Sequence, residues 1–415
     1  MNFSSEVDEL MKPFMKSFGK CDKPDISKAD HKLYQDSLNT LYKDIQESSD
    51  VVLDKGCFKH IILKRQDIKR PPDFNGRFFP TAIQTYIKEH EEYQMVFSCG
   101  NVGGRDITIY FSLFDEKELE RVDTYIQQVK MMYVWLNVCA KYANKHCSSS
   151  INIYIYPTPF TKELPNSATT VLGPEHVNTA FTFACAPQGQ LIIFRAEEWF
   201  KVFIHETFHA YGLDFAISKD TELNHFKEQI AELFPIDSDF DLYESYTETW
   251  ARIINCILCS FNSNKKLFME NVAFCIEMER MFAVYQCVKV LSFIGLHYRD
   301  IHRKHIQPEK EKETKNSISR KLYKENTHVF AYYVMTAVFL NDYEGFIVWC
   351  RKNNDSLLKF SSNEKGFKAF LEYITSVYNC APLNNSIAEM GRLTEQHNKS
   401  GNTRLKKSTR MSIIE

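Results

Sequence analysis

The pattern of apolar and polar positions divides the chain into a mixed first part and a helical second part. Beyond about residue 93, "YQMVFSCG" and "DITIYFSLF" have the composition of strands, and the glycines between them, Gly103 and Gly104, predict a hairpin turn. Three further short runs, "INIYIYPT", "NTAFTFAC" and "QLIIFR", are also strand-like. Together these runs predict a small mixed sheet.

Helical spacing of apolar residues appears on both sides of these strands. A long amphipathic helix is predicted over 115–145, with Asp115 as its N-cap, and another begins near 196–198. The remaining predicted helices cover 30–48, 81–92, 223–234, 242–261, 266–299, 326–340 and 344–350. The expected fold class is therefore α+β, with a mostly helical C-terminal region.

Four segments follow from this pattern. We expect an N-terminal mixed or helical region over 1–92, a domain over 93–264 that combines the predicted sheet with helices, a helical domain over 265–384, and a tail over 385–415. The tail ends in "NKSGNTRLKKSTRMSIIE", which is basic and is expected to be disordered. Such a tail could touch nucleic acid or an acidic partner, or it could simply be solvated.

Composition narrows the classes of protein. A hydrophobic content of 44% supports a substantial core, and a net charge of −2 gives no general argument for nucleic acid or a membrane surface. The longest apolar run, "VFAYYVMTAVFL", is too short to cross a bilayer, and "MNFSSEVDELMKPF" lacks a signal-peptide core. The twelve cysteines have no framework spacing, so we expect reduced thiols. The predicted location is intracellular, in the cytoplasm, and not secreted.

The candidate chemistry lies in "FKVFIHETFHAYGLDF". Residues four apart on a helix share one face, so His205 and His209 can bind one ion. Neutral imidazoles suit Zn²⁺, which in catalytic sites keeps one position for water. Glu206 lies about 100° round the helix and can reach that water as a general base. This is the logic of the HExxH motif.

A third zinc ligand must come from elsewhere in the chain. A metzincin has a histidine where Phe215 stands, and Asp214 is one place short of that position. Downstream, "YESYTETWARIIN" puts Glu244, Glu248 and Ala251 on one helical face. The sequence favours Glu248 as the ligand, with Glu244 as the alternative ligand or as a hydrogen-bond partner of a histidine ligand.

A group that stabilises the oxyanion is left open by the sequence. "ENTHVFAYYVMT" puts His328 and Tyr332 on one helical face, and Tyr243 is a further candidate. Each of these side chains could instead belong to the core or to a helix cap.

With "HETFH" and "ETWA", the chain resembles gluzincin-type zinc metallopeptidases over roughly 95–262. The order strand, helix, strand, two strands, histidine helix and glutamate helix is similar to the minimal zincin fold. The stretch from "HVNTAFTF" to "YTETWA" resembles uncharacterised predicted metallopeptidases of large DNA viruses. The resemblance implies Zn²⁺ as cofactor and a substrate-binding edge strand, for which "NTAFTFAC" is the candidate, with "QLIIFR" as its neighbour.

Two functions agree best with these residues. The first is a zinc metalloendopeptidase that hydrolyses peptide bonds in a protein or peptide substrate, without a membrane partner. The second is a zincin-fold structural or interaction protein, for example in a virus particle. The complete set His205, Glu206, His209 and Glu248 favours the enzyme. A third hypothesis is a protease associated with nucleic acid through its basic tail.

Overall fold

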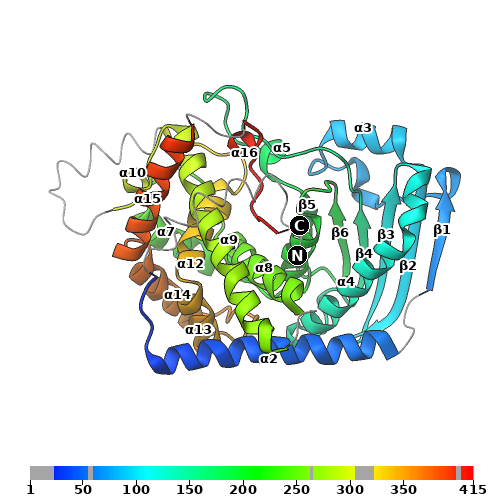
Figure 1. Cartoon of the computed structure of the whole chain (residues 1–415), viewed down its shortest axis with the longest axis horizontal. Helices are drawn as coiled ribbons and strands as arrows, with labels where there is room; N and C mark the ends of the chain where they lie inside the picture. The colour runs from blue at the N-terminus through cyan, green and yellow to red at the C-terminus, as the bar shows by residue number, and fades with distance from the viewer. Residues whose placement is uncertain (1–22, 55–58, 262–264, 304–321, 399–402, 415) are drawn as a thin grey trace.

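The computed structural model describes residues 23–54, 59–261, 265–303, 322–398 and 403–414. The chain is α+β, with a sheet on one side and a group of helices on the other (Figure 1). The long helix α2 (Lys28–Asp54) runs along one edge of both halves and packs against α4 and α13. The α+β class predicted from the sequence is confirmed.

The sheet has six strands in the order β1-β2-β3-β4-β6-β5. Neighbours are parallel between β3, β4 and β6 and antiparallel elsewhere, so the sheet is mixed. Its strands are β1 (Lys59–Lys64), β2 (Tyr93–Val102), β3 (Arg105–Leu113), β4 (Ser150–Ile155), β5 (Ala180–Thr182) and β6 (Gln188–Ile193). The segment predicted as the edge strand does form the edge, β5, and its predicted neighbour is β6.

The predicted hairpin joins β2 and β3. Gly103 and Gly104 have φ values of 58° and 82°, and Val102 pairs with Arg105 across the turn. A Cβ atom at Gly103 would lie 2.2 Å from the Cβ of Ala140, so this position tolerates no side chain.

The two faces of the sheet are covered by different helices. On one face, Ile153 and Leu191 join the main core with α4 (Val122–Tyr142) and α6 (Trp199–Ala210). On the other face, Tyr154 and Ile192 pack in a smaller core against α3 (Thr81–His90) and the 3₁₀ turn η2 (Pro72–Asn75). Helix α6, which carries the two histidines, is therefore held directly against the sheet.

The helical half is built round α8 (Leu242–Phe261), which packs against α6, α9 and α12. Its other elements are α7 (Asp220–Leu233), α9 (Lys265–Ile294), α10 (Tyr298–Ile301), the π-helix η4 (Phe330–Met335), α12 (Thr336–Asn341), α13 (Tyr343–Asn353), α14 (Glu364–Val377) and α15 (Ala381–Asn398). One continuous hydrophobic core crosses the boundaries that the sequence predicted at 92, 264 and 384.

The structure differs from the sequence predictions at β1, before α4 and in the tail. Strand β1 was not predicted; its side chains are mostly exposed, so it lacks the alternating pattern of a half-buried strand. The predicted helix over 115–145 begins as the 3₁₀ turn η3 (Glu116–Arg121), although Asp115 caps it as expected. The tail is not disordered where it is described: α15 and α16 (Thr403–Lys407) are helical, and residues 408–414 are buried.

Not every cysteine is reduced. Cys147 and Cys185 form a disulfide that joins the turn before β4 to the turn between β5 and β6. The prediction of reduced thiols is therefore wrong for this pair, which scattered spacing along the chain could not reveal. No helix in the described part of the chain is long and apolar enough to cross a membrane.

Candidate metal site

The site is built on α6, whose end is fixed by a left-handed glycine. Gly212 has φ +61°, and the Leu213 amide donates to the Phe208 carbonyl at 2.9 Å, which closes the helix. A Cβ atom at Gly212 would lie 3.0 Å from the Sγ atom of Cys147, so the disulfide packs behind this turn. The turn directs the chain back along the helix towards His209.

His205 and His209 lie on the same face of α6, as predicted. Their Nε2 atoms are 3.1 Å apart. Glu244 reaches this point from α8, with its Oε2 atom 3.1 Å from His205 Nε2 and 3.3 Å from His209 Nε2. The ligand atoms of these three buried residues all lie within 4.8 Å of one another. The group is close enough to hold a single metal ion.

Glu248 lies one turn further along α8 and faces a different nitrogen. Its Oε2 atom accepts a hydrogen bond from His205 Nδ1 at 3.0 Å. The same carboxylate is paired with the buried side chains of Lys201 and Arg252, each at 2.9 Å. Its oxygens are thus occupied by cations, whereas Glu244 occupies the position between the two Nε2 atoms.

His209 has a corresponding carboxylate partner that the sequence prediction missed. Its Nδ1 atom donates to Asp214 Oδ2 at 2.5 Å, and the Thr247 hydroxyl also donates to that oxygen at 3.2 Å. Asp214 was set aside because it does not share the ligand face of α6. The signal that could have found it is Gly212, since a left-handed glycine reverses the chain and returns the next residues to the helix.

Glu206 is buried with a relative exposure of 8% and lines a small pocket of about 30 Å³. The same pocket is lined by His205 and Tyr332, by Thr179 just before β5, and by Ala180, the first residue of β5. Burial raises the pKa of Glu206, against the lowering effect of the two histidines. A raised carboxyl pKa suits a group that both accepts and returns a proton.

The three candidates for oxyanion stabilisation differ in their distance from the ligand group. Tyr332, in the π-helix η4, donates its hydroxyl to Glu244 Oε2 at 3.0 Å. His328 Nε2 lies 3.9 Å from Glu244 Oε1. Tyr243 donates instead to Asp241 at 3.0 Å. Of the three, Tyr332 therefore has its polar atom nearest the ligand oxygen.

Charges within the group are strongly coupled. Burial favours the neutral forms, but the His209 charge and hydrogen bonds from both histidines hold the pKa of Glu244 well below its ordinary value. Burial likewise opposes a charge on His209, and Glu244 and Asp214 more than offset it, so the pKa of His209 is raised well above its ordinary range. The carboxylates thus create a place that favours positive charge.

A second group of possible ligands consists of His146, Cys147 and Cys185. The two cysteines are joined in a disulfide, so neither has a thiol that can bind a metal. Among the described residues, the group of His205, His209 and Glu244 is the better metal site.

Comparisons of the chain with protein-family models, with curated proteins and with solved structures find no match. A function must therefore be argued from the motif and from the geometry of the site.

Proposed function

We propose that the chain is a zinc-dependent metallopeptidase with a zincin-like catalytic core. In this proposal His205, His209 and Glu244 bind Zn²⁺, and Glu206 is the general base. The observation that carries the proposal is the convergence of two Nε2 atoms and one carboxylate oxygen at distances of 3.1 to 3.3 Å. Glu244, the alternative ligand from the sequence, replaces Glu248 in this role.

The donor set fits zinc. Two imidazoles and one carboxylate are a common set of protein ligands for catalytic Zn²⁺. Each imidazole donates its Nδ1 proton to a carboxylate, His205 to Glu248 and His209 to Asp214. This leaves the Nε2 lone pairs for the ion and fixes the orientation of both rings.

Zinc, when bound, would polarise a peptide carbonyl and make a water acidic near neutral pH. Glu206, which lines the same small pocket as His205, would take a proton from the attacking water and return it to the leaving amine. Tyr332 can donate its hydroxyl proton to the developing oxyanion, since its OH group already contacts a ligand oxygen. The burial of these groups excludes bulk water and strengthens their interactions.

A peptide substrate is supported by the position of β5. This short strand is at the edge of the sheet, and Ala180, its first residue, lines the same pocket as Glu206. An edge strand offers unpaired amide and carbonyl groups, with which an extended peptide can pair.

The proposal is tested by metal content and by cleavage of a peptide library. Purified wild type is expected to hold about one equivalent of zinc, and His205→Ala to lose it. Glu206→Gln should retain zinc and cleave no peptide, because it keeps the shape of the residue but loses the base. Less than half an equivalent of zinc in metal-replete wild type would reject the proposal.

The second candidate function is a zincin-fold structural or interaction protein. It is favoured by the small pocket, because about 30 Å³ beside Glu206 leaves no room for an amino-acid residue. Zinc without cleavage across the library would support it. Binding of nucleic acid through the basic tail stays a prediction: Arg404 and Lys407 are exposed, whereas residues 408–414 are buried.

A further inference from the structure

The C-terminal segment lies inside the molecule, next to the candidate metal site. The segment begins at α16, near the surface, and runs inward between α9 and β5. Figure 1 shows this path in red. All seven residues from 408 to 414 are buried. The segment thus occupies the space between the helical half and the sheet half.

The outer part of the segment pairs with a loop in the manner of a β-strand. Ser408 forms an antiparallel bridge with Glu163. The Leu164 amide donates to the Lys407 carbonyl at 2.7 Å, and the Thr409 amide donates to the Lys162 carbonyl at 3.0 Å. These contacts use backbone groups and do not depend on the side chains of the segment.

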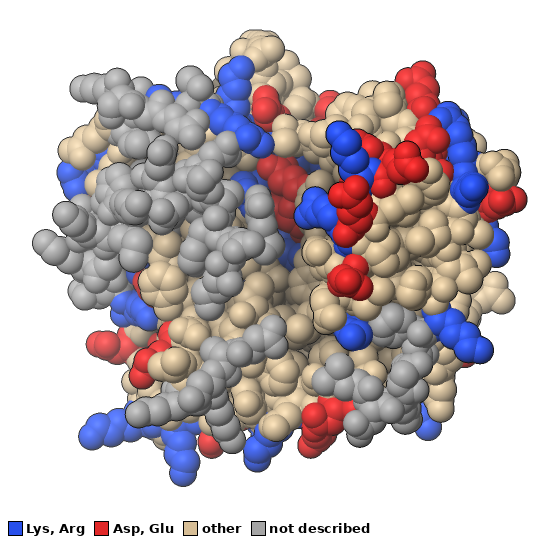
Figure 2. Space-filling view, turned by 45° about the vertical axis from the view of Figure 1, so that its right-hand side comes forward, with Lys and Arg blue, Asp and Glu red and all other residues tan. Residues whose placement is uncertain are grey.

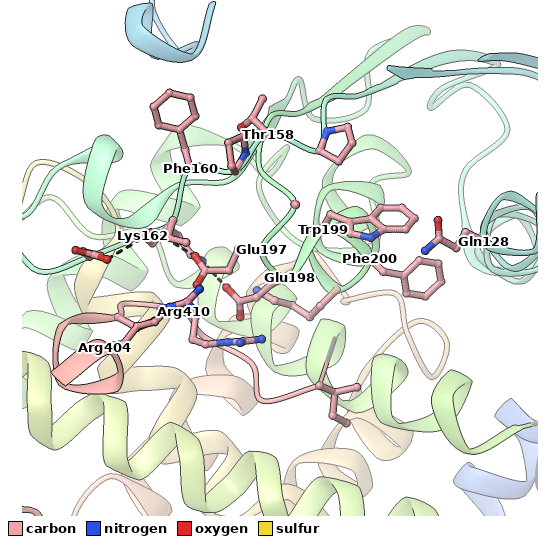
Figure 3. A pocket seen from close by; sticks show the side chains of 18 of the residues that line it. Gln128, Thr158, Phe160, Lys162, Glu197, Glu198, Trp199, Phe200, Arg404 and Arg410 are labelled. Atoms are coloured by element: carbon pink, nitrogen blue, oxygen red, sulfur yellow. Dashed lines mark hydrogen bonds and ion pairs between the residues drawn. The ribbon is translucent and has the colours of Figure 1, made fainter. Parts of the chain in front are cut away.

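The inner part is held by two buried carboxylates. Glu198 accepts the amide of Met411 at 2.7 Å and also the amide of Ser412. Glu279 accepts the Ser412 hydroxyl at 2.6 Å and the Ile413 amide at 3.0 Å. Figure 3 shows Glu198 between Lys162 and Arg410.

A buried carboxylate that accepts backbone amides costs desolvation free energy, because its charge must be removed from water. Apolar packing alone would achieve the same burial at lower cost. Contacts to backbone amides are also how a groove binds an extended peptide, while pockets for its side chains add specificity.

Met411 closes the pocket beside the metal site. It lines the pocket of about 30 Å³ together with His205, Glu206 and Tyr332. Its Sδ atom lies 4.0 Å from Lys201 Nζ, one turn before His205 on α6. A substrate peptide can reach Glu206 from this side only after Met411 has moved.

A wider cleft gives the segment room to leave. The cleft has a volume of about 860 Å³ and is lined by Leu405, Arg410 and Ile414 of the segment, together with Glu197 and Lys201. Figure 2 shows the surface hollowed between the two halves, with acidic and basic side chains beside the hollow. The cleft and the small pocket share Lys162 and Lys201, so they adjoin.

We infer that residues 403–414 are an intramolecular peptide ligand of this cleft, and that their departure opens the metal site. The cleft then accepts other extended peptides, with a basic residue at the position of Arg410 and an apolar one at that of Met411. The statement about opening the site for catalysis rests on the proposed function, whereas peptide binding by the cleft does not.

Peptide exchange tests the inference without requiring zinc. A recognition site for a specific protease is placed at 399–402 of the full chain, and the folded protein is cut there. A labelled synthetic peptide of residues 403–415 should then replace the cut segment and bind saturably, while uncut protein should not bind it. A peptide with Met411→Asp should bind at least tenfold more weakly.

Three results would overturn the inference. They are equal binding of the peptide to cut and uncut protein, equal affinity of the Met411→Asp peptide, and a cut segment that never exchanges or whose loss unfolds the protein. A cut segment that never exchanges, or whose loss unfolds the protein, would make the segment a fixed part of the core.

A second measurement uses the uncut chain. In zinc-loaded protein, Met411→Ala should speed the loss of zinc to an excess of chelator at least tenfold, and Met390→Ala, a buried methionine of α15, should not. Equal rates in the two variants would contradict the inference. Absence of zinc together with normal peptide exchange would instead reject the proposed function alone.

Discussion

The Nδ1 atom of His205 donates to Glu248 at 3.0 Å, so Glu248 orients this histidine from the side opposite its Nε2 atom. Lys201 and Arg252 hold the same carboxylate from two further directions. Glu248 is thereby fixed as a partner of the imidazole, and the Nε2 atom is left for a metal.

The two glutamates of α8 should therefore differ in their effect on zinc. We expect Glu244→Gln to weaken zinc binding by more than a hundredfold, because it removes a charged ligand. Glu248→Gln should cost about tenfold to a hundredfold, as is usual for a partner of a ligand. Titration against a chromophoric chelator gives both affinities. A larger loss for Glu248→Gln would restore Glu248 as the ligand.

Tyr332 should act on the rate of the reaction and not on substrate binding. If its hydroxyl stabilises the oxyanion, Tyr332→Phe is expected to lower kcat about a hundredfold to a thousandfold with little change in KM. Tyr243→Phe is the matched control, since its hydroxyl donates to Asp241. Equal losses in the two variants would remove Tyr332 from this role.

Zinc affinity should depend on pH through His209. Asp214 and Glu244 raise the pKa of His209 against the effect of burial, so a proton competes with zinc into the neutral range. Affinity is expected to rise with pH until His209 loses its proton. Asp214→Asn removes one of the charges that raise this pKa, and should flatten the pH dependence near neutrality as well as weaken zinc binding. If zinc affinity changed equally with pH in wild type and in Asp214→Asn between pH 6 and pH 8, this explanation would be wrong.

The disulfide should stabilise the fold behind the site. It closes a sequence separation of 38 residues, and the entropy of a loop of this length corresponds to about 3–4 kcal/mol. Replacing both Cys147 and Cys185 by serine should lower the free energy of unfolding by about this amount, measured by denaturant titration. Cys259→Ser, at a partly buried free thiol, is the control. No difference between the variants would show that the bond does not contribute.

Asp342 should make stability fall as pH rises from about 4 to about 7. Burial raises its pKa to about 7, although Tyr373 donates a hydrogen bond to it at 3.1 Å. The folded chain therefore keeps a proton that the unfolded chain loses near pH 4, so folding is favoured most at the acidic end of this window. Relative to Asp342→Asn, the loss should be on the order of 4 kcal/mol over the whole window. A constant difference between the two proteins at all pH values would reject this assignment.

The elements predicted best from the sequence are those in which the apolar residues repeat with the period of a helix or a strand. Helix α8 has the predicted limits because its apolar face repeats with helical spacing over its whole length. Strand β1 was missed because "KHIILK" is an exposed edge with no buried face. The HExxH pair was found because two residues of one helix define it.

The choice between Glu244 and Glu248 could not be made from α8 alone. The two lie one turn apart on one face, so only the position of α8 against α6 decides which meets the histidines. Lys201 was the usable signal, since it lies one turn before His205 and a carboxylate beside it is neutralised by its ammonium group. That inference requires the two helices to be in register, which is a property of the packed structure.

The continuous core has a consequence for dividing this protein into parts. Arg252 of α8 pairs with Glu248 and lies 3.8 Å from Glu279 of α9, so the charges behind His205 extend past residue 264. A fragment limited to 93–264 would lack Glu279 and the η4 tyrosine at 332. The motif that looks portable in the sequence thus depends on helices that follow it, and transplanting it to another scaffold would require moving both halves together.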